Sequence, residues 1–470
     1  MGLSRRTVLL GGAATAVAIP AVSHVYWGSK DYPRDDFDPG LPKAADGERP
    51  WTNWSEILKA TPQDISFPTT ADEVAMLVRE SPAPIRPVGS GHSFTALAPT
   101  EGTMIDVSAL SGMISHDTEQ QTASFGAGSR LQESAKLLSE QGLGFANLPD
   151  IDVQTLAGGF ATATHGTGYN LSAIHDYVKA FELVTPTGDI ISASADSNAD
   201  LFRAGKVSLG SLGVITRFDL KVEKAFNLRR QTGLMKLENL LSQFDSQSQK
   251  YRNFEIYYFP HTGYGAYIQH EVFEGDVTGR QEGEDDNILA DLKELRDTLG
   301  WWPWLRRKVV QGELAEGQVE DMSDAAWKLL ATTRNDKFNE IEYHMPLNKG
   351  LETLEEIIAS IESRGETFFP IEARVTAPDD AWLSPFNDGR RFSIAIHAPY
   401  NEDFSYFFTD FEPILQKNGG RPHWGKMHSM KANELRELYP NFDAFNNLRK
   451  ELDPNGKFIN PYLAEIWGDA

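Results

Sequence analysis

The stretch that organises this chain is Ile85-Arg-Pro-Val-Gly-Ser-Gly-His-Ser-Phe-Thr95, where a short apolar run breaks into two glycines around a serine. It predicts a strand that leads into a loop able to hold a phosphate group. Gly89 and Gly91 permit backbone conformations that larger residues resist, so the N–H groups from Gly89 to Ser93 can converge on a pyrophosphate. His92 would then lie beside the bound group. The alternative reading is an ordinary tight turn that carries a plain loop histidine.

A nicotinamide site of the Rossmann type is disfavoured by the glycine spacing. The G-x-G-x-x-G fingerprint needs a third glycine where Phe94 stands, and Gly126-Ala-Gly128 fails the same test at Leu131. The loop therefore predicts a different way of holding a phosphate-containing group.

Length, charge and composition narrow the class of protein. The 470 residues are enough for two domains with a core each. A formal net charge of -23 would repel phosphate chains and argues against nucleic-acid binding. The same charge favours a soluble monomer. Because the chain has no cysteine, disulfides, thiolate nucleophiles and cysteine metal sites are all excluded.

The N-terminus resembles a twin-arginine export signal. Arg5 and Arg6 precede an apolar run that is rich in alanine, glycine and valine and extends to about Val22. We assign residues 1–28 to the signal and exclude them from the fold, with residues 29–50 as a spacer. The expected partner is the twin-arginine machinery, which carries folded proteins, and the expected location is periplasmic or extracellular. The alternative is an uncleaved segment that anchors the protein to a membrane.

Local patterns predict an α+β protein with a first domain over residues 51–220. A helix is expected over residues 70–79, with a capping box made by Thr70 and Glu73. Short strands and a second helix through Leu131, Ala135 and Leu138 follow. This alternation without a regular repeat is typical of an α+β fold.

From about Lys221 the segments become longer and more charged, so a cap domain is expected over 221–445 and a return of the chain over 446–470. Strands are predicted over 251–260 and 339–346. The acidic run at 282–286 is expected to be a solvated loop. The tryptophans at 301–304 favour a helical cover on the cap domain over a membrane-facing lip.

Two further glycine-rich stretches accompany the first. Thr155-Leu-Ala-Gly-Gly-Phe-Ala-Thr-Ala-Thr-His-Gly-Thr-Gly168 combines a backbone that a flat ligand can approach with short hydroxyl side chains. Val207-Ser-Leu-Gly-Ser-Leu-Gly-Val-Ile-Thr216 is the third stretch. One such loop could serve packing alone, but three of them predict the walls of one elongated site.

Together the three runs resemble the FAD-binding domain of the vanillyl-alcohol-oxidase type of flavoproteins. The later part of the chain resembles the aldonolactone oxidase branch, which includes alditol oxidase, and the resemblance extends from about Trp51 to Trp467. It implies a PCMH-type FAD-binding domain of two subdomains, followed by an α+β cap domain with an antiparallel sheet.

The resemblance also implies which residues hold the cofactor. His92 occupies the position that is joined covalently to the C8 methyl of the isoalloxazine, and a neutral imidazole is a competent nucleophile. The implied cofactor-binding residues are Gly89, Ser90, Gly91, His92 and Ser93 for the pyrophosphate, Thr155, Gly158, Gly159, Phe160, Ala163, Thr164, His165 and Gly166 along the flavin and diphosphate, and Gly213, Val214 and Ile215 at the adenine end.

A carboxylate and a guanidinium are expected on one face of a strand. In the run 369–376 apolar residues alternate with Glu372 and Arg374, and a period of two places these two side chains about 7 Å apart along the strand. A surface salt bridge is the alternative. The resemblance favours a catalytic pair, because the corresponding E-x-R pair of aldonolactone and alditol oxidases faces the flavin.

Two more candidates lie on later segments. His397 ends an alternating strand over 391–397, where a structural histidine is the alternative. Lys426 stands in His423-Trp-Gly-Lys426, a run of the form H-W-G-K found in the family, and its neighbour Trp424 indicates burial. The resemblance implies that both contact the substrate.

Hydrolytic and metal-dependent chemistry are not expected. No G-x-S-x-G elbow is present. The pairs His165 with His175 and His423 with His428 lack the spacing of a known metal motif, so no metal site is predicted.

The expected activity is oxidation of an alcohol group of a sugar lactone or polyol by hydride transfer to flavin N5. Arg374 and Lys426 would stabilise the developing alkoxide, Glu372 and His397 would orient the substrate, and Thr155 is a further contact. Oxygen would reoxidise the flavin and give hydrogen peroxide. The alternatives are a dehydrogenase that passes electrons to a quinone or cytochrome, and a flavin- or carbohydrate-binding module without turnover.

Overall fold

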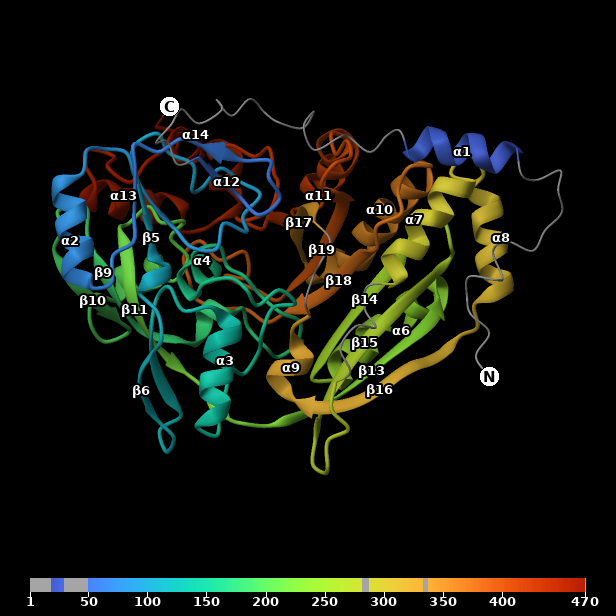
Figure 1. Ribbon diagram of the computed structural model, residues 1–470, viewed down its shortest axis with the longest axis horizontal. Coiled ribbons are helices and arrows are strands. Elements are labelled where there is room, and N and C mark those ends of the chain that lie inside the picture. The colour runs from blue at the N-terminus through green and yellow to red at the C-terminus, as the bar shows by residue number, and fades with distance from the viewer. Residues whose placement is uncertain (1–17, 29–49, 281–286, 333–336, 470) are drawn as a thin grey trace.

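The computed structural model describes residues 18–28, 50–280, 287–332 and 337–469. Figure 1 shows two lobes side by side, with the N-terminal lobe on the left and the cap lobe on the right. The N-terminal lobe contains the three glycine-rich stretches, and the cap lobe contains one large sheet. The predicted α+β class is confirmed by this mixture of helices and mainly antiparallel sheets.

The first glycine loop extends from a small parallel sheet. Its three strands follow the order β3-β5-β4, with bounds Asp64–Ser66, Thr103–Asp106 and Ile85–Val88. Helix α2 (Ala71–Glu80) covers this sheet with the buried side chains of Val74, Ala75 and Val78. Thr70 caps the helix as expected, and the Glu73 carboxylate accepts from the Thr69 amide (2.7 Å).

A second, antiparallel sheet completes the core of the N-terminal lobe. Its five strands follow the order β10-β9-β11-β7-β6, with bounds Ile190–Ser194, Val178–Val184, Val214–Lys221, Thr122–Gly126 and Met113–Asp117. The helices of this lobe are α3 (Leu131–Glu140), α4 (Leu156–Ala161) and α5 (Ala199–Gly205). Two short pairs, β1 (Trp51–Thr52) with β2 (Lys59–Ala60) and β8 (Leu143–Gly144) with β12 (Glu223–Lys224), complete it.

The cap lobe is built on an eight-stranded antiparallel sheet. Its order is β16-β13-β15-β14-β18-β19-β17-β20, with bounds Gly317–Ala325, Asn227–Lys236, Tyr264–Phe273, Asn253–Phe259, Ile371–Thr376, Arg391–Pro399, Phe338–Pro346 and Arg421–Pro422. Helices α6 (Leu237–Lys250) and α10 (Gly350–Glu362) pack against this sheet. Phe244 of α6 contacts Phe254 and Phe392, with ring centroids 5.7 and 4.9 Å apart.

Two helices form the cover that the tryptophan-rich segment predicts. They are α7 (Asn287–Leu299) and α8 (Pro303–Glu313), which Figure 1 shows beside the β13–β16 half of the sheet. The remaining helices are α9 (Ala326–Leu330), α11 (Glu412–Lys417), α12 (Ala432–Leu438), α13 (Phe442–Leu452) and α14 (Pro461–Trp467).

The last 11 residues of the expected signal segment belong to the folded structure. Helix α1 (Ala18–Gly28) packs against α7, and its Trp27 is 6% exposed. The Arg296 guanidinium lies 5.7 Å from the Trp27 ring. Arg5, Arg6, the spacer from residue 29 to 49 and the acidic run at 282–286 lie outside the described residues. Among the described helices, none combines the length and apolarity needed to cross a bilayer.

The C-terminal segment returns to the N-terminal lobe. The Ile85 amide donates to the Lys457 carbonyl at 2.8 Å, and the Asn460 side chain donates to the carbonyls of Ala96 (2.8 Å) and Pro99 (2.9 Å). The segment between α13 and α14 therefore holds β4 and the loop that follows it.

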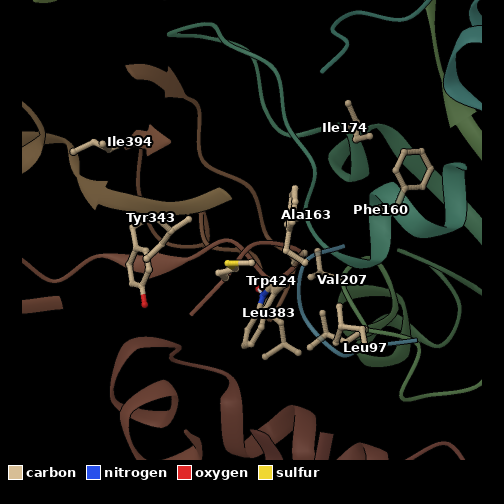
Figure 2. Close-up of a cluster of buried hydrophobic side chains, with 14 of the residues drawn as sticks. Leu97, Phe160, Ala163, Ile174, Val207, Tyr343, Leu383, Ile394 and Trp424 are labelled. Atoms are coloured by element: carbon tan, nitrogen blue, oxygen red, sulfur yellow. Dashed lines mark hydrogen bonds between the residues drawn. The ribbon is translucent and has the colours of Figure 1, made fainter. Parts of the chain in front are cut away.

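The two lobes share one hydrophobic core. Figure 2 shows buried side chains of Phe160, Ala163 and Val207 from the N-terminal lobe gathered with Leu383 and Trp424 from the cap half of the chain. A common core fixes how the lobes sit relative to each other, and hence the shape of the space between them.

Candidate active site

A cavity of about 2110 Å³ lies between the three glycine loops and one face of the eight-stranded sheet. The loops contribute residues from Gly89 to Ser93, from Gln154 to His165, and from Ser208 to Ile215. The sheet contributes polar side chains from β14, β18, β19 and β17. The three stretches that the sequence predicts as walls of one site therefore meet at one cavity.

Arg86 ties the first and third loops together. Its buried guanidinium donates to the carbonyls of Leu97 (2.7 Å), Leu209 (2.7 Å), Gly210 (2.9 Å) and Phe458 (2.6 Å). Burial lowers the pKa of Arg86 to about 9. The sequence analysis missed this role, because no local pattern separates an arginine that organises loops from any other arginine on a strand.

The backbone conformation at position 91 explains why the first loop has a glycine there. Gly91 has φ +67°, a conformation that L side chains rarely adopt, and a Cβ there would lie 3.3 Å from the Trp51 ring. The Ser90 hydroxyl donates to the Val153 carbonyl at 2.7 Å, which joins the first loop to the segment before the second. The loop is thus held from both sides while it lines the cavity.

His92 lines the cavity as a neutral imidazole. Its ring stacks on Trp54 with centroids 5.2 Å apart. Burial lowers the pKa of His92 to about 4, and the positive charges of Lys426 and Arg130 contribute to the same shift. A histidine with this pKa keeps a free electron pair at neutral pH.

Most of the predicted cofactor residues reach the cavity. These are Gly89, Ser90, Gly91, His92, Ser93, Thr155, Gly158, Thr164, His165, Gly213, Val214 and Ile215. The Thr155 hydroxyl also accepts from the Gly158 amide at 3.1 Å, so that Thr155 caps α4.

Four predicted cofactor residues, Gly159, Phe160, Ala163 and Gly166, lie behind the cavity wall instead. Gly159 and Phe160 lie on the inner side of α4, and the Phe160 ring packs against Phe218 with centroids 4.8 Å apart. Ala163 is fully buried, and a Cβ on Gly166 would lie 2.3 Å from the Leu148 carbonyl oxygen. These residues serve close packing, which a sequence run cannot distinguish from ligand contact.

Arg374 is the centre of the charged cluster on the sheet. Its Nη1 lies 3.0 Å from Glu372 Oε1, and its Nη2 lies 3.1 Å from Glu342 Oε1. All three residues are buried and line the cavity, so a surface salt bridge is excluded. Burial alone would lower the pKa of Arg374, but Glu372, Glu342 and Glu255 raise it well above its ordinary value.

Glu342 completes this cluster from strand β17. Its Oε1 also lies 2.9 Å from His165 Nε2 of the second glycine loop. Burial would raise the pKa of Glu342, yet Arg374 and His165 hold it well below the ordinary value. The loop wall and the sheet wall are therefore joined by a charged hydrogen-bond network.

Glu255 of β14 is a cavity residue that the sequence analysis did not identify. It pairs in register with Arg374 of β18. Burial, followed by the negative charge of Glu372, raises the pKa of Glu255 to about 8. At neutral pH this side chain is a carboxylic acid that can donate a hydrogen bond into the cavity. The sequence signal that could have identified Glu255 is its place in the predicted strand over 251–260, where side chains alternate between the two faces of the sheet.

Lys426 and His397 meet at Glu340. The Lys426 ammonium forms an ion pair with Glu340, and His397 Nε2 lies 3.7 Å from Glu340 Oε1. His397 Nδ1 lies 3.2 Å from the Pro370 carbonyl oxygen. Burial raises the pKa of Glu340, although Lys426 opposes this effect. All three residues line the same cavity as Glu372 and Arg374.

Three buried groups come closer than the sequence spacing suggests. The ligand atoms of His165, Glu342 and His423 lie within 4.8 Å of one another and could hold a metal ion. The sequence analysis predicted no metal site because it compared histidines that are close along the chain, and it missed these three residues, which are far apart in the sequence. However, Glu342 Oε1 already lies within hydrogen-bond distance of His165 and Arg374, and His423 Nδ1 accepts from the Gly425 amide at 3.0 Å. We therefore interpret the three side chains as part of a hydrogen-bond network beside the cations Arg374 and Lys426.

The cavity also offers acceptors for a large polar ligand. Within the described part of the chain, Gln154 Oε1 and Glu342 Oε2 are buried without a hydrogen-bond partner, and both residues line the cavity. A buried acceptor calls for a donor from a ligand or water. FAD, with its flavin N–H, ribityl hydroxyls and pyrophosphate, matches these acceptors together with the glycine loops.

Comparison with known families gives two adjacent matches. A family model described as an FAD-binding domain matches residues 62–194. A second, described as D-arabinono-1,4-lactone oxidase, matches residues 218–466. The first match lies in the N-terminal lobe, and the second covers the cap lobe and the C-terminal segment that returns to the N-terminal lobe.

Three relatives are similar along nearly their whole length. An L-gulono-1,4-lactone dehydrogenase of Mycobacterium tuberculosis is 32% identical over 89% of this chain and 99% of its own. An L-gulonolactone oxidase of Bos taurus is 29% identical over 88% and 97%. An alditol oxidase of a Streptomyces species is 26% identical over 88% and 98%.

Solved structures share the fold. A cholesterol oxidase of B. sterolicum superimposes with a TM-score of 0.73 at 14% identity, over 91% of this chain and 99% of that one. With the family matches and the relatives, this agrees with the resemblance seen in the three glycine runs and the E-x-R strand. The chain belongs to the D-arabinono-1,4-lactone oxidase family of FAD-linked oxidoreductases.

Proposed function

We propose that this protein oxidises an alcohol group of a sugar lactone or polyol with FAD as the cofactor. The observation that carries the proposal is that the buried pair of Arg374 and Glu372 and the ammonium of Lys426 line the same cavity as the glycine loops. The relatives named as acting on gulonolactones and alditols support the same substrate class.

The chain's own residues would bind the alcohol and stabilise its alkoxide. Arg374 stays positively charged at any working pH, so it can stabilise negative charge on the substrate oxygen. Lys426 adds a second cation across the sheet, at Glu340. Glu372 and the neutral acid of Glu255 can accept from and donate to the remaining hydroxyls. Bound FAD supplies the acceptor for the hydride, at flavin N5.

An anaerobic screen tests this proposal. The purified enzyme is mixed with xylitol, L-gulono-1,4-lactone, D-arabinono-1,4-lactone and a simple hydroxy acid, and the visible absorption band of oxidised flavin is followed. Loss of the band with a lactone or polyol is the expected result. A flavin that none of these compounds reduces would contradict the proposal and favour a binding module.

We propose oxygen as the acceptor that reoxidises the flavin, with hydrogen peroxide as product. Relatives carry both oxidase and dehydrogenase names, so the acceptor needs its own measurement. Oxygen uptake with stoichiometric peroxide is expected. No oxygen uptake, with turnover of an artificial dye, would identify a dehydrogenase that uses a quinone or cytochrome.

We propose that His92 carries FAD covalently. Its place on the cavity wall and its neutral ring both favour attack on an electron-poor methyl group. Denatured enzyme should keep flavin fluorescence in a gel, and His92→Ala should lose it. Release of all flavin from the denatured wild type would refute the bond.

We propose export by the twin-arginine route to the periplasm or beyond, on the evidence of Arg5 and Arg6 before an apolar run. Replacing both with lysine should retain the protein in the cytoplasm, as measured by fractionation. Export that is unchanged in this variant would remove the proposal. Because α1 packs on the cap lobe, the same fractions should be tested for a retained N-terminal segment and membrane attachment.

A further inference from the structure

The cavity continues past the charged cluster into a space that we call the apolar chamber. Its walls are the sheet on one side and helices α7 and α8 on the other. Its apolar lining includes Leu234 and Phe259 from the sheet, Leu292 and Leu295 from α7, and Val309 and Val310 from α8, while the exposed polar side chains of α7 and α8 also reach the cavity.

The change from polar to apolar follows a single strand. On β14, Glu255 pairs with Arg374 and Tyr257 pairs with Glu372. Phe259 is the next residue on the same face, because strand side chains alternate, and it packs with Leu292 of α7. A molecule held at Arg374 therefore meets apolar walls about 7 Å to 14 Å further along the strand.

The cavity has room for a cofactor beside the glycine loops and for a second ligand that extends past the charged cluster. Small-molecule sites usually enclose about 300–1,000 Å³, whereas this cavity encloses about 2110 Å³. A lactone or polyol carries hydroxyls on nearly every carbon and cannot satisfy them against leucine and valine side chains. The apolar chamber instead suits hydrocarbon, which apolar cavities bind readily.

The apolar chamber also reaches the protein surface. Ile288 of α7 and Val319 of β16 line the cavity and are 46% and 57% exposed. An elongated ligand could therefore place one end at the charged cluster and the other at this opening.

Resting on the proposed function, we propose that the preferred substrate is an amphiphile: a polyol or sugar lactone that carries an alkyl, acyl or isoprenoid tail. The hydroxylated head lies at Glu372 and Arg374, and the tail lies in the apolar chamber beneath α7 and α8. The chamber thus determines specificity through the tail, without contact with the reacting carbon.

A pair of glycosides tests the tail apart from the reaction. Octyl β-D-glucopyranoside, kept below its micelle concentration, and methyl β-D-glucopyranoside are titrated calorimetrically into the oxidised holoenzyme. Each buried methylene contributes about fourfold in affinity, so the octyl compound should bind at least about a hundredfold more tightly. Its heat capacity change should be negative. Equal affinities of the two glycosides would overturn the proposal.

Two tryptophan substitutions on α8, one inside the apolar chamber and one outside it, test where the tail binds. Val309→Trp should reduce octyl binding to within about threefold of methyl binding, because the indole occupies the space of the tail. Gln311→Trp, on the exposed side of the same helix, should leave both affinities unchanged. Tight octyl binding that survives Val309→Trp would place the tail elsewhere and overturn the proposal. Should that variant not fold, Ile288→Asp at the opening gives the same comparison.

Kinetics separate this inference from the proposed function. Xylitol and 1-O-octylxylitol are compared in the anaerobic screen. A lower dissociation constant for the octyl compound, obtained from the concentration dependence of flavin reduction and abolished by Val309→Trp, supports the tail site if the limiting rate of reduction by xylitol is unchanged. Reduction by xylitol with no gain from the tail would overturn the tail site and keep the alcohol oxidation. Tight octyl binding without flavin reduction by any polyol would keep the tail site and overturn the alcohol oxidation.

Discussion

The two walls of the cavity are built in different ways. The N-terminal lobe contributes loops, whose backbone and small side chains face the cavity. The cap lobe contributes strands, whose charged side chains alternate with core residues. A loop wall depends on the exact path of the chain, so substitutions there act on folding and cofactor binding. A strand wall keeps its path when a side chain changes, so substitutions there act on chemistry and substrate choice, and on stability where a buried charge loses its partner.

Replacement of Arg374 should give the largest effect on the strand wall. Arg374→Ala removes the charge that stabilises the alkoxide and should lower kcat by about a hundredfold or more. It also leaves Glu372 and Glu342 buried without their cation, at a cost of about 3–5 kcal/mol in unfolding free energy. Arg374→Lys should restore only part of the rate. Stopped-flow reduction, with flavin content as control, measures the rate, and thermal unfolding measures the stability; an unchanged rate would move the reaction centre to Lys426 and His397.

Replacement of Arg86 tests the loop wall. Arg86→Met leaves four carbonyl groups without their donor and should lower the unfolding free energy by about 3 kcal/mol, with loss of bound flavin. Arg79→Met is the control, because its guanidinium donates to the single Gly188 carbonyl. Flavin content and thermal unfolding are measured. Equal losses in the two variants would show that Arg86 does not organise the loops.

The pKa of Glu255 gives the strand wall a pH dependence. Because this pKa is raised to about 8, the folded protein binds a proton that the unfolded chain releases above about pH 4.5. Stability from Glu255 is therefore fully present in acid and is lost as pH rises to 8, by up to about 2 kcal/mol between pH 6 and 8. Glu255→Gln should flatten the melting temperature over this range. Glu73→Gln is the control, because the lowered pKa of Glu73 affects stability only in acid. If the melting temperature of Glu255→Gln still falls between pH 6 and 8, another group causes the pH dependence.

The smallest effect is expected at the cap of α4. Thr155→Ala removes the acceptor of the Gly158 amide and should cost about 1 kcal/mol. Thr155→Ser keeps the hydroxyl and should be close to neutral. Thermal unfolding compares the two. A large loss of activity in Thr155→Ala that Thr155→Ser does not share would support the substrate contact expected for Thr155.

Local features of this protein were predictable, while its long-range neighbours were not. The Thr70 cap, the glycine loops and the shared face of Glu372 and Arg374 follow from short patterns and agree with the structure. Glu342 joins Arg374 only because the sheet order is β18-β19-β17, which runs against the order of the chain.

The sequence also does not show which side chains of a helix or loop face the core. Phe160 stands inside a glycine-rich run that lines the cavity, yet its ring belongs to the core. Helix α1 has the composition of an export signal, yet Trp27 packs into the cap lobe. In both cases the sequence gives the composition correctly, whereas tertiary contacts determine where each side chain lies.

The contacts of the C-terminal segment determine when the cofactor site can be completed during synthesis. The strand before the first glycine loop relies on the Lys457 and Phe458 carbonyls, and the loop after it relies on Asn460. A ribosome produces these residues after both lobes. The nascent chain therefore lacks a closed dinucleotide site until residues 457–460 have been made and have packed against the N-terminal lobe.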